Sequence, residues 1–167
     1  MNNSIRVILT SIPKENRLNY MSYLLQADET QQMITAYINK GELFSVRKAE
    51  NTVGAVLFIP IDNQVIELKN IAIDASFRGK GIGKAVIEEA IVLFKEKGFT
   101  MMIVGTANSS IENIAFYQKA GFRISGVRKG FFEDYPEPIY ENGIRALDMV
   151  MFEREITEES RRDNEDT

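Results

Sequence analysis

The chain has no cysteine and no histidine among its 167 residues. Without cysteine it has no disulfide, no thiolate metal site, no iron–sulfur cluster and no cysteine nucleophile. Without histidine, Ser-His-Asp hydrolases, histidine-ligated zinc sites and imidazole general bases are excluded as well. Any catalysis must therefore use carboxylates, tyrosine, lysine, hydroxyl groups, backbone groups or a bound cofactor.

A basic excess and a long apolar run are also missing. The formal net charge is −4, which disfavours nucleic-acid binding and favours a cationic small molecule or a lysine-bearing peptide as partner. No stretch approaches the roughly 18 apolar residues of a membrane span. The first ten residues, MNNSIRVILT, lack the apolar core and cleavage site of a signal peptide. We therefore expect a cytoplasmic protein that binds neither nucleic acid nor a membrane.

The composition is that of one globular domain with a polar end. Hydrophobic residues make up 44% of the chain and charged residues 26%, which is an ordinary balance for a packed core. The length predicts a single domain over residues 1–156. Residues 157–167 are polar and lack an apolar face, so they are predicted to form a disordered tail.

Hydrophobic periodicity predicts alternating strands and helices. Strands are expected over residues 5–9, 43–48, 53–60, 64–74, 99–104, 122–127 and 145–152, and helices over 13–26, 28–41, 81–97 and 109–121. The second, third and fourth strands follow one another through short links, so they should pair antiparallel. The expected fold class is mixed α/β (α+β), with a central mixed, mostly antiparallel sheet and helices on both faces. Ser109 and Glu112 have the spacing of a capping box at the start of the last helix.

The strongest motif is a glycine-rich turn between a predicted strand and an apolar helix, Ile73-Asp74-Ala75-Ser76-Phe77-Arg78-Gly79-Lys80-Gly81-Ile82-Gly83-Lys84. Glycines let backbone N–H groups converge at a helix N-terminus, which favours anions. Arg78, Lys80 and Lys84 add positive charge at the same place. The turn therefore predicts a pyrophosphate site, and a tight helix entry with solvated charges is the alternative.

Two common nucleotide-binding motifs do not fit this turn. A Walker A loop has glycine where Arg78 stands and a hydroxyl residue where Ala85 stands. The dinucleotide-binding motif has its third glycine where Lys84 stands, and it follows the first strand of a βαβ unit rather than an antiparallel meander. ATP or GTP hydrolysis and a nucleotide-binding regulator are therefore disfavoured.

The segment Arg78-Gly79-Lys80-Gly81-Ile82-Gly83 resembles the R/Q-x-x-G-x-G/A motif of the GCN5-related N-acetyltransferase (GNAT) superfamily. Ile71-Ala72-Ile73, before the turn, is similar to that family's fourth strand, and residues 113–122 resemble its N-x-x-A-x-x-x-Y-x-x-x-G-F segment. The order of elements agrees with the family from about residue 5 to 152. Within the superfamily the chain is similar to small bacterial acetyltransferases of unassigned substrate.

This resemblance implies direct transfer of an acetyl group from acetyl-CoA, as co-substrate, to a primary amine of a small molecule or peptide, without a metal. A non-catalytic acyl-CoA-binding sensor or interaction module is the alternative. The residues that the resemblance assigns to acetyl-CoA are Ile71, Ala72, Ile73, Arg78, Gly79, Lys80, Gly81, Ile82, Gly83, Lys84, Asn108, Asn113 and Tyr117.

Glu67 and Tyr117 are the candidate catalytic residues. An alkylammonium must lose a proton before its nitrogen can attack the thioester. Glu67 matches the strand position from which a Glu acts as general base in the histone-acetylating branch of the family. An outward-facing Glu, with a water chain as the base, is the alternative. Tyr117 lies one helical turn after Asn113 and matches the motif tyrosine that can protonate the departing thiolate. A packing role for its ring is the alternative.

The loop from Phe131 to Gly143 is rich in acidic and aromatic residues, which suit a cationic amine. The candidate substrate residues in this loop are Glu133, Asp134, Tyr135 and Tyr140. A homodimer contact or a solvated hairpin loop is the alternative.

Overall fold

The structure is a computed structural model that describes residues 5–28 and 30–156. The predicted tail, residues 157–167, lies outside these described ranges. The chain forms two compact units, which divide between Phe99 and Thr100. Each unit has its own strands and helices.

The first unit contains four antiparallel strands in the order β1-β2-β3-β4. Their bounds are β1 Ile8–Ser11, β2 Glu42–Lys48, β3 Asn51–Pro60 and β4 Val65–Ile73. The meander β2-β3-β4 matches the predicted strands and confirms their antiparallel pairing. The first strand was predicted to begin at Ile5, whereas β1 begins at Ile8 and ends at Ser11.

The helices of the first unit differ most from the prediction near the N-terminus. They are η1 Lys14–Tyr20, α1 Met21–Leu24, α2 Gln31–Tyr37, η2 Ala75–Phe77 and α3 Ile82–Glu96. The helical run predicted over residues 13–26 is confirmed only in part, since a 3-10 helix followed by one α-helical turn occupies this range. The apolar residues at helical spacing in this range do not form one buried face, because Leu18 is 65% exposed. Buried Arg17 also donates to the carbonyl oxygens of Ile38 and Gly41, so tertiary contacts override the local pattern.

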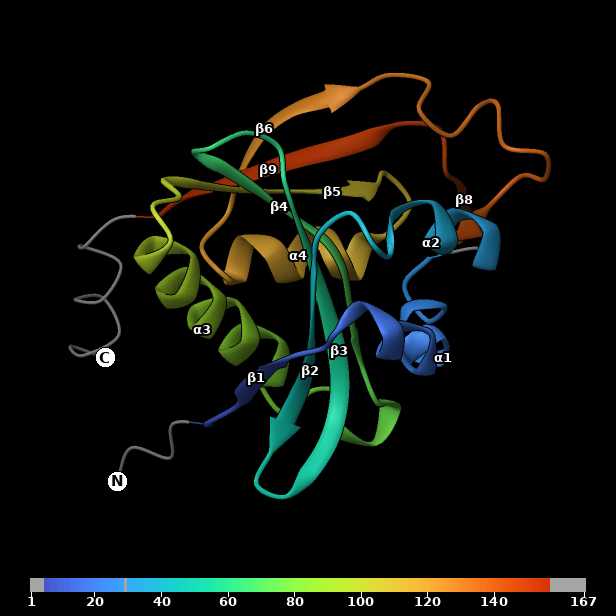
Figure 1. The fold of residues 1–167 in the computed structure, drawn as a ribbon. Helices are drawn as coiled ribbons and strands as arrows, with labels where there is room; N and C mark the ends of the chain where they lie inside the picture. The colour runs from blue at the N-terminus through green and yellow to red at the C-terminus, as the bar shows by residue number, and fades with distance from the viewer. Residues whose placement is uncertain (1–4, 29, 157–167) are drawn as a thin grey trace. The chain divides into compact units, whose positions relative to one another are not determined.

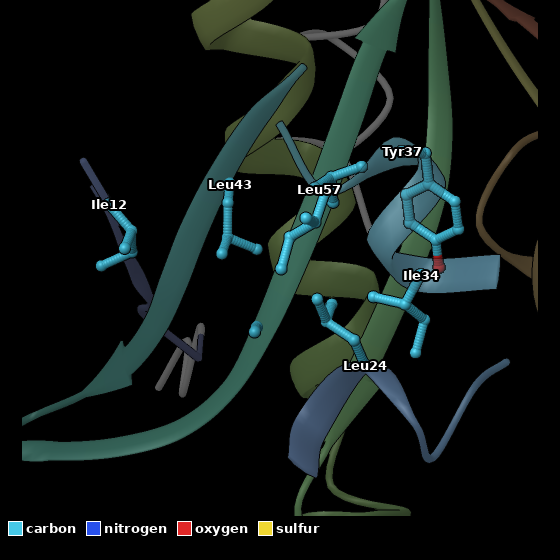
Figure 2. Close-up of a cluster of buried hydrophobic side chains, with 8 residues drawn as sticks. Ile12, Leu24, Ile34, Tyr37, Leu43 and Leu57 are labelled. Carbon is cyan, nitrogen blue, oxygen red and sulfur yellow. The ribbon is translucent and has the colours of Figure 1, made fainter. Parts of the chain in front are cut away.

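Helices cover both faces of this four-stranded sheet (Figure 1). On one face, α1 and α2 enclose an apolar cluster that Figure 2 shows in close-up. Its buried members are Ile12, Leu24, Ile34, Tyr37, Ile38, Leu43, Ala55 and Leu57. On the other face, the ring of Phe94 from α3 packs 4.8 Å from Phe58 and 6.5 Å from Phe44, measured between ring centroids. The arrangement agrees with the predicted helices on both faces.

A β-bulge interrupts the pairing of β3 with β4. Leu57 pairs with Asn70 and Phe58 pairs with Leu68, which leaves Lys69 as an extra residue on β4. Glu67 pairs with Ile59, whose side chain packs against the apolar cluster. The bulge therefore directs Glu67 and Asn70 to the face that α1 and α2 cover.

The second unit contains the strands β5, β9 and β6 side by side in this order, with β9 antiparallel to both neighbours, and a separate two-stranded hairpin of β7 and β8. Its elements are β5 Met101–Ala107, α4 Ile111–Lys119, β6 Arg123–Arg128, β7 Tyr140–Glu141, β8 Ile144–Arg145 and β9 Met149–Glu155. The described strands thus pair antiparallel within each unit, as the expected fold class requires.

The two short strands β7 and β8 were not predicted, although a hairpin loop was an alternative for this segment. Asn142 and Gly143 form the turn between these strands, with φ angles of 55° and 72°. An Asn-Gly pair suits such a turn because both central residues need a positive φ. This dipeptide was the available signal within the segment interpreted as a long loop.

The predicted capping box is wrong. Ser110, rather than Ser109, is the N-cap of α4, and neither serine caps the helix with its side chain. The Ser110 hydroxyl instead donates to Glu141, 2.5 Å away. A tertiary contact with the β7–β8 hairpin therefore replaces the local one.

Candidate functional site

The glycine-rich turn leads directly from β4 through η2 into α3. Gly79 and Gly81 have φ angles of 75° and 79°, in the left-handed region that favours glycine. Gly81 is the N-cap of α3, and no side chain caps the helix there. Both glycines are exposed. The first N–H groups of this 15-residue helix are thus available to an anion.

The basic side chains of the turn differ in what they contact. Arg78 donates from Nε to the carbonyl oxygen of Ile73, at 3.0 Å, and from Nη2 to Oε1 of Gln26, at 2.9 Å. Arg78 therefore braces the turn against the end of β4 and the segment after α1. The Lys80 ammonium lies 5.5 Å from the centre of the Phe77 ring, and Lys84 is exposed on α3.

The other residues of the first unit that were predicted to bind acetyl-CoA lie directly before and after this turn, at the end of β4 and the start of α3. Ala72 is buried on the α1–α2 side of β4, and its neighbours Ile71 and Ile73 are half-buried. Ile82 is buried in the first turn of α3, followed by half-buried Gly83. The first unit thus brings the strand end and the turn together, as the motif predicts.

Glu67 lies on the α1–α2 side of β4 with a partly covered carboxylate. Its side chain is 20% exposed, and its Oε1 lies 3.8 Å from Nζ of Lys69, the bulge residue. A carboxylate in this position is accessible to a small ligand while it stands on a rigid strand.

A hydrogen-bond chain that the sequence analysis missed lies on the same face. Nδ2 of Asn70 donates to the carbonyl oxygen of Leu24, at 2.9 Å, and to the hydroxyl of Tyr37, at 3.0 Å. Tyr37 in turn donates to Asp28, at 2.9 Å. Burial, with the negative charge of Asp28, raises the pKa of Tyr37 above its usual value, although the Asn70 hydrogen bond opposes this shift. The adjacent polar residues Lys69 and Asn70, which interrupt the alternation of polar and apolar residues in β4, were the available signal.

A second tyrosine joins α1 to the glycine-rich turn. The hydroxyl of Tyr23 donates to Asp74, the residue after β4, at 3.2 Å. Burial and the neighbouring Asp74 carboxylate raise the pKa of Tyr23. Together with the Arg78–Gln26 contact, this hydrogen bond fixes the start of the turn to the α1 segment.

In the second unit, Tyr117 on α4 is 5% exposed and surrounded by aromatic rings. Its ring centroid lies 5.2 Å from Phe116, 5.7 Å from Phe122 and 5.7 Å from Phe152. Burial raises the pKa of Tyr117, which keeps its hydroxyl protonated. Asn113, one helical turn earlier, is exposed and donates to the Thr106 hydroxyl over 3.4 Å.

The side chain of Asn108 is engaged within the second unit. Its Oδ1 accepts from the backbone N–H groups of Leu147 and Asp148, at 2.8 and 3.1 Å, and its Nδ2 donates to the carbonyl oxygen of Arg145. These hydrogen bonds hold the segment before β9 in an irregular conformation. They explain why β9 begins at Met149 instead of the predicted Arg145.

Of the candidate substrate residues, Tyr140 lies in β7, whereas Glu133, Asp134 and Tyr135 lie in the segment that precedes it along the chain. Tyr135 contacts Phe132, with 5.2 Å between ring centroids, whereas Glu133, Asp134 and Tyr140 are exposed. Asn142 joins the hairpin to the start of α4 by donating to Glu112. The pKa of Glu112 is lowered by its backbone hydrogen bond and by this contact.

Metal-binding carboxylate groups and membrane-spanning helices are both absent from the residues that the structure describes. Over residues 5–28 and 30–156, no group of three or more Asp or Glu side chains is arranged to hold a metal ion. The helices in these ranges include none long and apolar enough to cross a membrane.

Comparison with known proteins decides the family. The model of the acetyltransferase (GNAT) family matches residues 4–122. The chain belongs to this family. It is also 37% identical over 128 residues to the uncharacterized N-acetyltransferase YvbK of Bacillus subtilis, an alignment that covers 76% of this chain and 83% of YvbK.

Two solved structures of GNAT-type proteins are similar over nearly their whole length. A GNAT family acetyltransferase from Elizabethkingia anophelis with acetyl-CoA bound has a TM-score of 0.83 and 35% identity, covering 91% of this chain and 99% of that chain. A Bacillus subtilis acetyltransferase in complex with CoA has a TM-score of 0.78 and 32% identity, with coverage of 91% and 99%.

These findings confirm the predicted fold class and activity. The protein is an acyl-CoA-dependent N-acetyltransferase, and acetyl-CoA is its co-substrate. GNAT acetyltransferases act on amines, so the acceptor is an amine. A non-catalytic acyl-CoA-binding module is not favoured.

Proposed function

We propose that the protein acetylates a primary amine of a small molecule or peptide by direct transfer, with Glu67 as general base and Tyr117 as general acid. The observation that carries this proposal is the open N-terminus of α3 after two left-handed glycines, in a chain of the GNAT family. No metal takes part in the proposed reaction.

The backbone N–H groups between Arg78 and Lys84 would hold the pyrophosphate of acetyl-CoA. Support comes from Gly79 and Gly81, which offer no side chain to obstruct an approaching phosphate. Lys80 and Lys84 add positive charge, while Arg78 stiffens the turn through its contacts with Ile73 and Gln26. The end of β4, residues 71–73, would contact the pantetheine arm.

The proton on the acceptor is the first chemical obstacle. An alkylamine with a pKa of about 10.4 is almost fully protonated near neutral pH, and its neutral form costs roughly 4–5 kcal/mol there. The Glu67 carboxylate would accept this proton directly or through one water. Its position on a paired strand keeps the carboxylate in place, and its partial exposure leaves room for the amine.

The departing thiolate is the second obstacle. The raised pKa of Tyr117 keeps the phenol protonated at every pH at which the enzyme would work. The same shift makes the phenol a weaker acid, so we expect its proton to move only as negative charge develops on the sulfur. Asn113, Asn108 and the Tyr117 hydroxyl would contact the pantetheine arm.

The hairpin region supplies the charge that a cationic acceptor needs. Glu133, Asp134, Tyr135 and Tyr140 would contact the body of the substrate through charge and aromatic faces. Three of the four are exposed, which is what an acceptor-binding loop requires.

A thiol-release assay tests the proposal. The purified protein is incubated with acetyl-CoA and a panel of alkylamines, polyamines, aminoglycosides and peptides, and free CoA is measured over time. We expect release with at least one primary amine, and the release should survive EDTA. The melting temperature should rise with CoA but not with ATP or NAD. Binding of CoA without release in any assay would instead support a sensor.

A further inference from the structure

Lys69 lies at the bulge of β4. In the sequence it stands between Glu67, the candidate base, and Ile71, the first residue of β4 assigned to acetyl-CoA. It is the extra residue that β3 does not pair with. Its side chain is 33% exposed, and its Nζ lies 3.8 Å from Oε1 of Glu67 and 5.2 Å from the centre of the Tyr37 ring. A primary ammonium therefore stands beside the carboxylate that we assign as the base.

The surroundings of this ammonium are held in place by other contacts. Tyr37 is 7% exposed, and its hydroxyl is fixed between Asp28 and Asn70. Its ring is thus a rigid aromatic face, and Glu67 stands on a paired strand. A carboxylate next to an aromatic face is a favourable environment for an alkylammonium.

The role assigned to Glu67 defines where the acceptor nitrogen must stand. A general base acts on a group within hydrogen-bond reach, or through one water. At 3.8 Å, the Lys69 nitrogen needs only a small rotation of a flexible side chain to reach this range. Lys69 therefore occupies the region that an external amine would occupy before transfer.

We propose that Lys69 is an internal acetyl acceptor, which the enzyme acetylates in cis when no external amine competes. This inference rests on the proposed function, in particular on Glu67 as the base. Glu67 takes a proton from the ε-ammonium, and the neutral nitrogen attacks the carbonyl carbon of acetyl-CoA. A C–N bond forms and the C–S bond breaks. The nitrogen loses its second proton as the amide forms, and the thiolate takes up one proton. The products are N-acetyl-Lys69 and free CoA, and the proton on Glu67 passes to solvent.

Acetylation would change the site in a definite way. The amide carries no charge, so both the ion pair with Glu67 and the cation–π contact with Tyr37 are lost. The acetyl group would also remain beside the base. We therefore expect the modified enzyme to turn over external amines more slowly than the unmodified enzyme.

Lys97 provides a matched control within the same unit. Its Nζ lies 2.6 Å from Oε1 of Glu42 and 5.8 Å from the centre of the Phe94 ring, so it too has a carboxylate and an aromatic face. Its side chain is 41% exposed, slightly more than that of Lys69. Spontaneous acetylation by acetyl-CoA should therefore modify Lys97 at least as fast as Lys69.

The test is a time course of the full-length protein with acetyl-CoA and no added amine, in which peptide mass spectrometry follows each lysine. Lys69 should be acetylated roughly 100-fold faster than Lys97, because Glu67 is the proposed base beside the bound donor, whereas Glu42, the carboxylate beside Lys97, is not part of the proposed site. The rate constant should not change with enzyme concentration, and an added alkylamine substrate should slow the modification. Glu67→Gln should bring the rate at Lys69 close to that at Lys97.

Equal rates at Lys69 and Lys97 in the wild-type protein would overturn the inference without recourse to any variant. A Lys69 rate constant that rises with enzyme concentration would also overturn it, since the transfer would then occur between molecules. The thiol-release panel separates this failure from failure of the proposed function. Transfer to an added amine without modification of Lys69 would leave the proposed function intact, whereas the absence of both would contradict the function itself.

Discussion

At the scale of single residues, the two candidate catalytic groups have opposite surroundings. Tyr117 lies among three aromatic rings, and burial raises its pKa. Glu67 is partly exposed and has a cationic neighbour, Lys69. A buried phenol stays protonated and can donate, whereas an accessible carboxylate can accept a proton from a ligand. These surroundings suit an acid and a base, respectively.

Replacement of Tyr117 by Phe separates catalysis from packing. If Tyr117 protonates the thiolate, Tyr117→Phe should lower kcat by roughly 10²–10⁴-fold. The affinity for CoA should fall far less than kcat, because only one of the proposed contacts with the pantetheine arm is removed. The free energy of unfolding should change little, because the ring and its aromatic contacts are retained. Steady-state kinetics, calorimetry and urea unfolding measure these three quantities. An unchanged kcat, with chemistry shown to limit the rate, would identify Tyr117 as a packing residue.

Replacement of Glu67 by Gln has a different pH dependence. Without its base the enzyme depends on free amine from solution, whose fraction rises about tenfold per pH unit below the amine pKa of about 10.4. Glu67→Gln should therefore slow the reaction most at low pH and partly recover its rate as the pH rises. The pH profile of kcat/KM for wild type and variant measures this. An equal loss at every pH would instead indicate that Glu67 positions the acceptor.

At the scale of elements, the junction of β4, η2 and α3 was predictable because its pattern is local. The glycines at 79 and 81 and the apolar stripe after them fixed the turn and the helix to within a residue or two. The brace from Arg78 to Gln26 was not predictable, because its partners are far apart in the sequence. The bulge at Lys69 depends on the register with β3, which no pattern in β4 alone reveals.

Gly81→Ala tests the anion site, and Gly98→Ala is its matched control. Gly98 also has a positive φ, 93°, but it lies just beyond the other end of α3. Both variants should lose about 1–2 kcal/mol of stability, since a Cβ is unfavourable in left-handed backbone. Only Gly81→Ala should weaken CoA binding, by roughly 10- to 100-fold, the cost of one or more charge-assisted hydrogen bonds.

Calorimetric titration with CoA, alongside urea unfolding, measures both effects. Equal CoA affinities of the two folded variants would contradict a pyrophosphate site at the N-terminus of α3. In Gly81→Ala the side chain of Ile5 must also shift slightly, since its Cδ1 would lie 3.2 Å from the new Cβ at position 81. This contact affects stability and not the affinity difference.

At the scale of the whole molecule, the sequence predicted the fold class and the family but not the polar contacts. Alternating apolar residues and glycine stops are repeated signals, so the meander and α3 matched closely. A single hydrogen bond between two side chains leaves no repeating pattern in the sequence. The hydrogen bonds of Asn108 and the Asp28–Tyr37–Asn70 chain each join residues distant in sequence, and they became visible only in the folded chain.

These contacts give the molecule a defined response to alkaline pH. Tyr23, Tyr37 and Tyr117 all have pKa values raised by burial. Above about pH 10 the unfolded chain ionises its tyrosines, while the folded chain binds the protons of these three more tightly. The unfolded state then binds fewer protons, so the free energy of unfolding must fall as the pH rises through this range.

Urea unfolding between about pH 8 and about pH 11 measures this loss, across the ordinary tyrosine pKa of about 10. Tyr117→Phe should make the decline with pH shallower, because phenylalanine cannot ionise in either state. Tyr140→Phe is the control, since the Tyr140 side chain is 64% exposed and loses little solvent on folding. Its decline should therefore match that of the wild type. If Tyr117→Phe and Tyr140→Phe decline equally, the Tyr117 hydroxyl is in contact with solvent in the folded protein, and it is then a stronger acid than its burial implies.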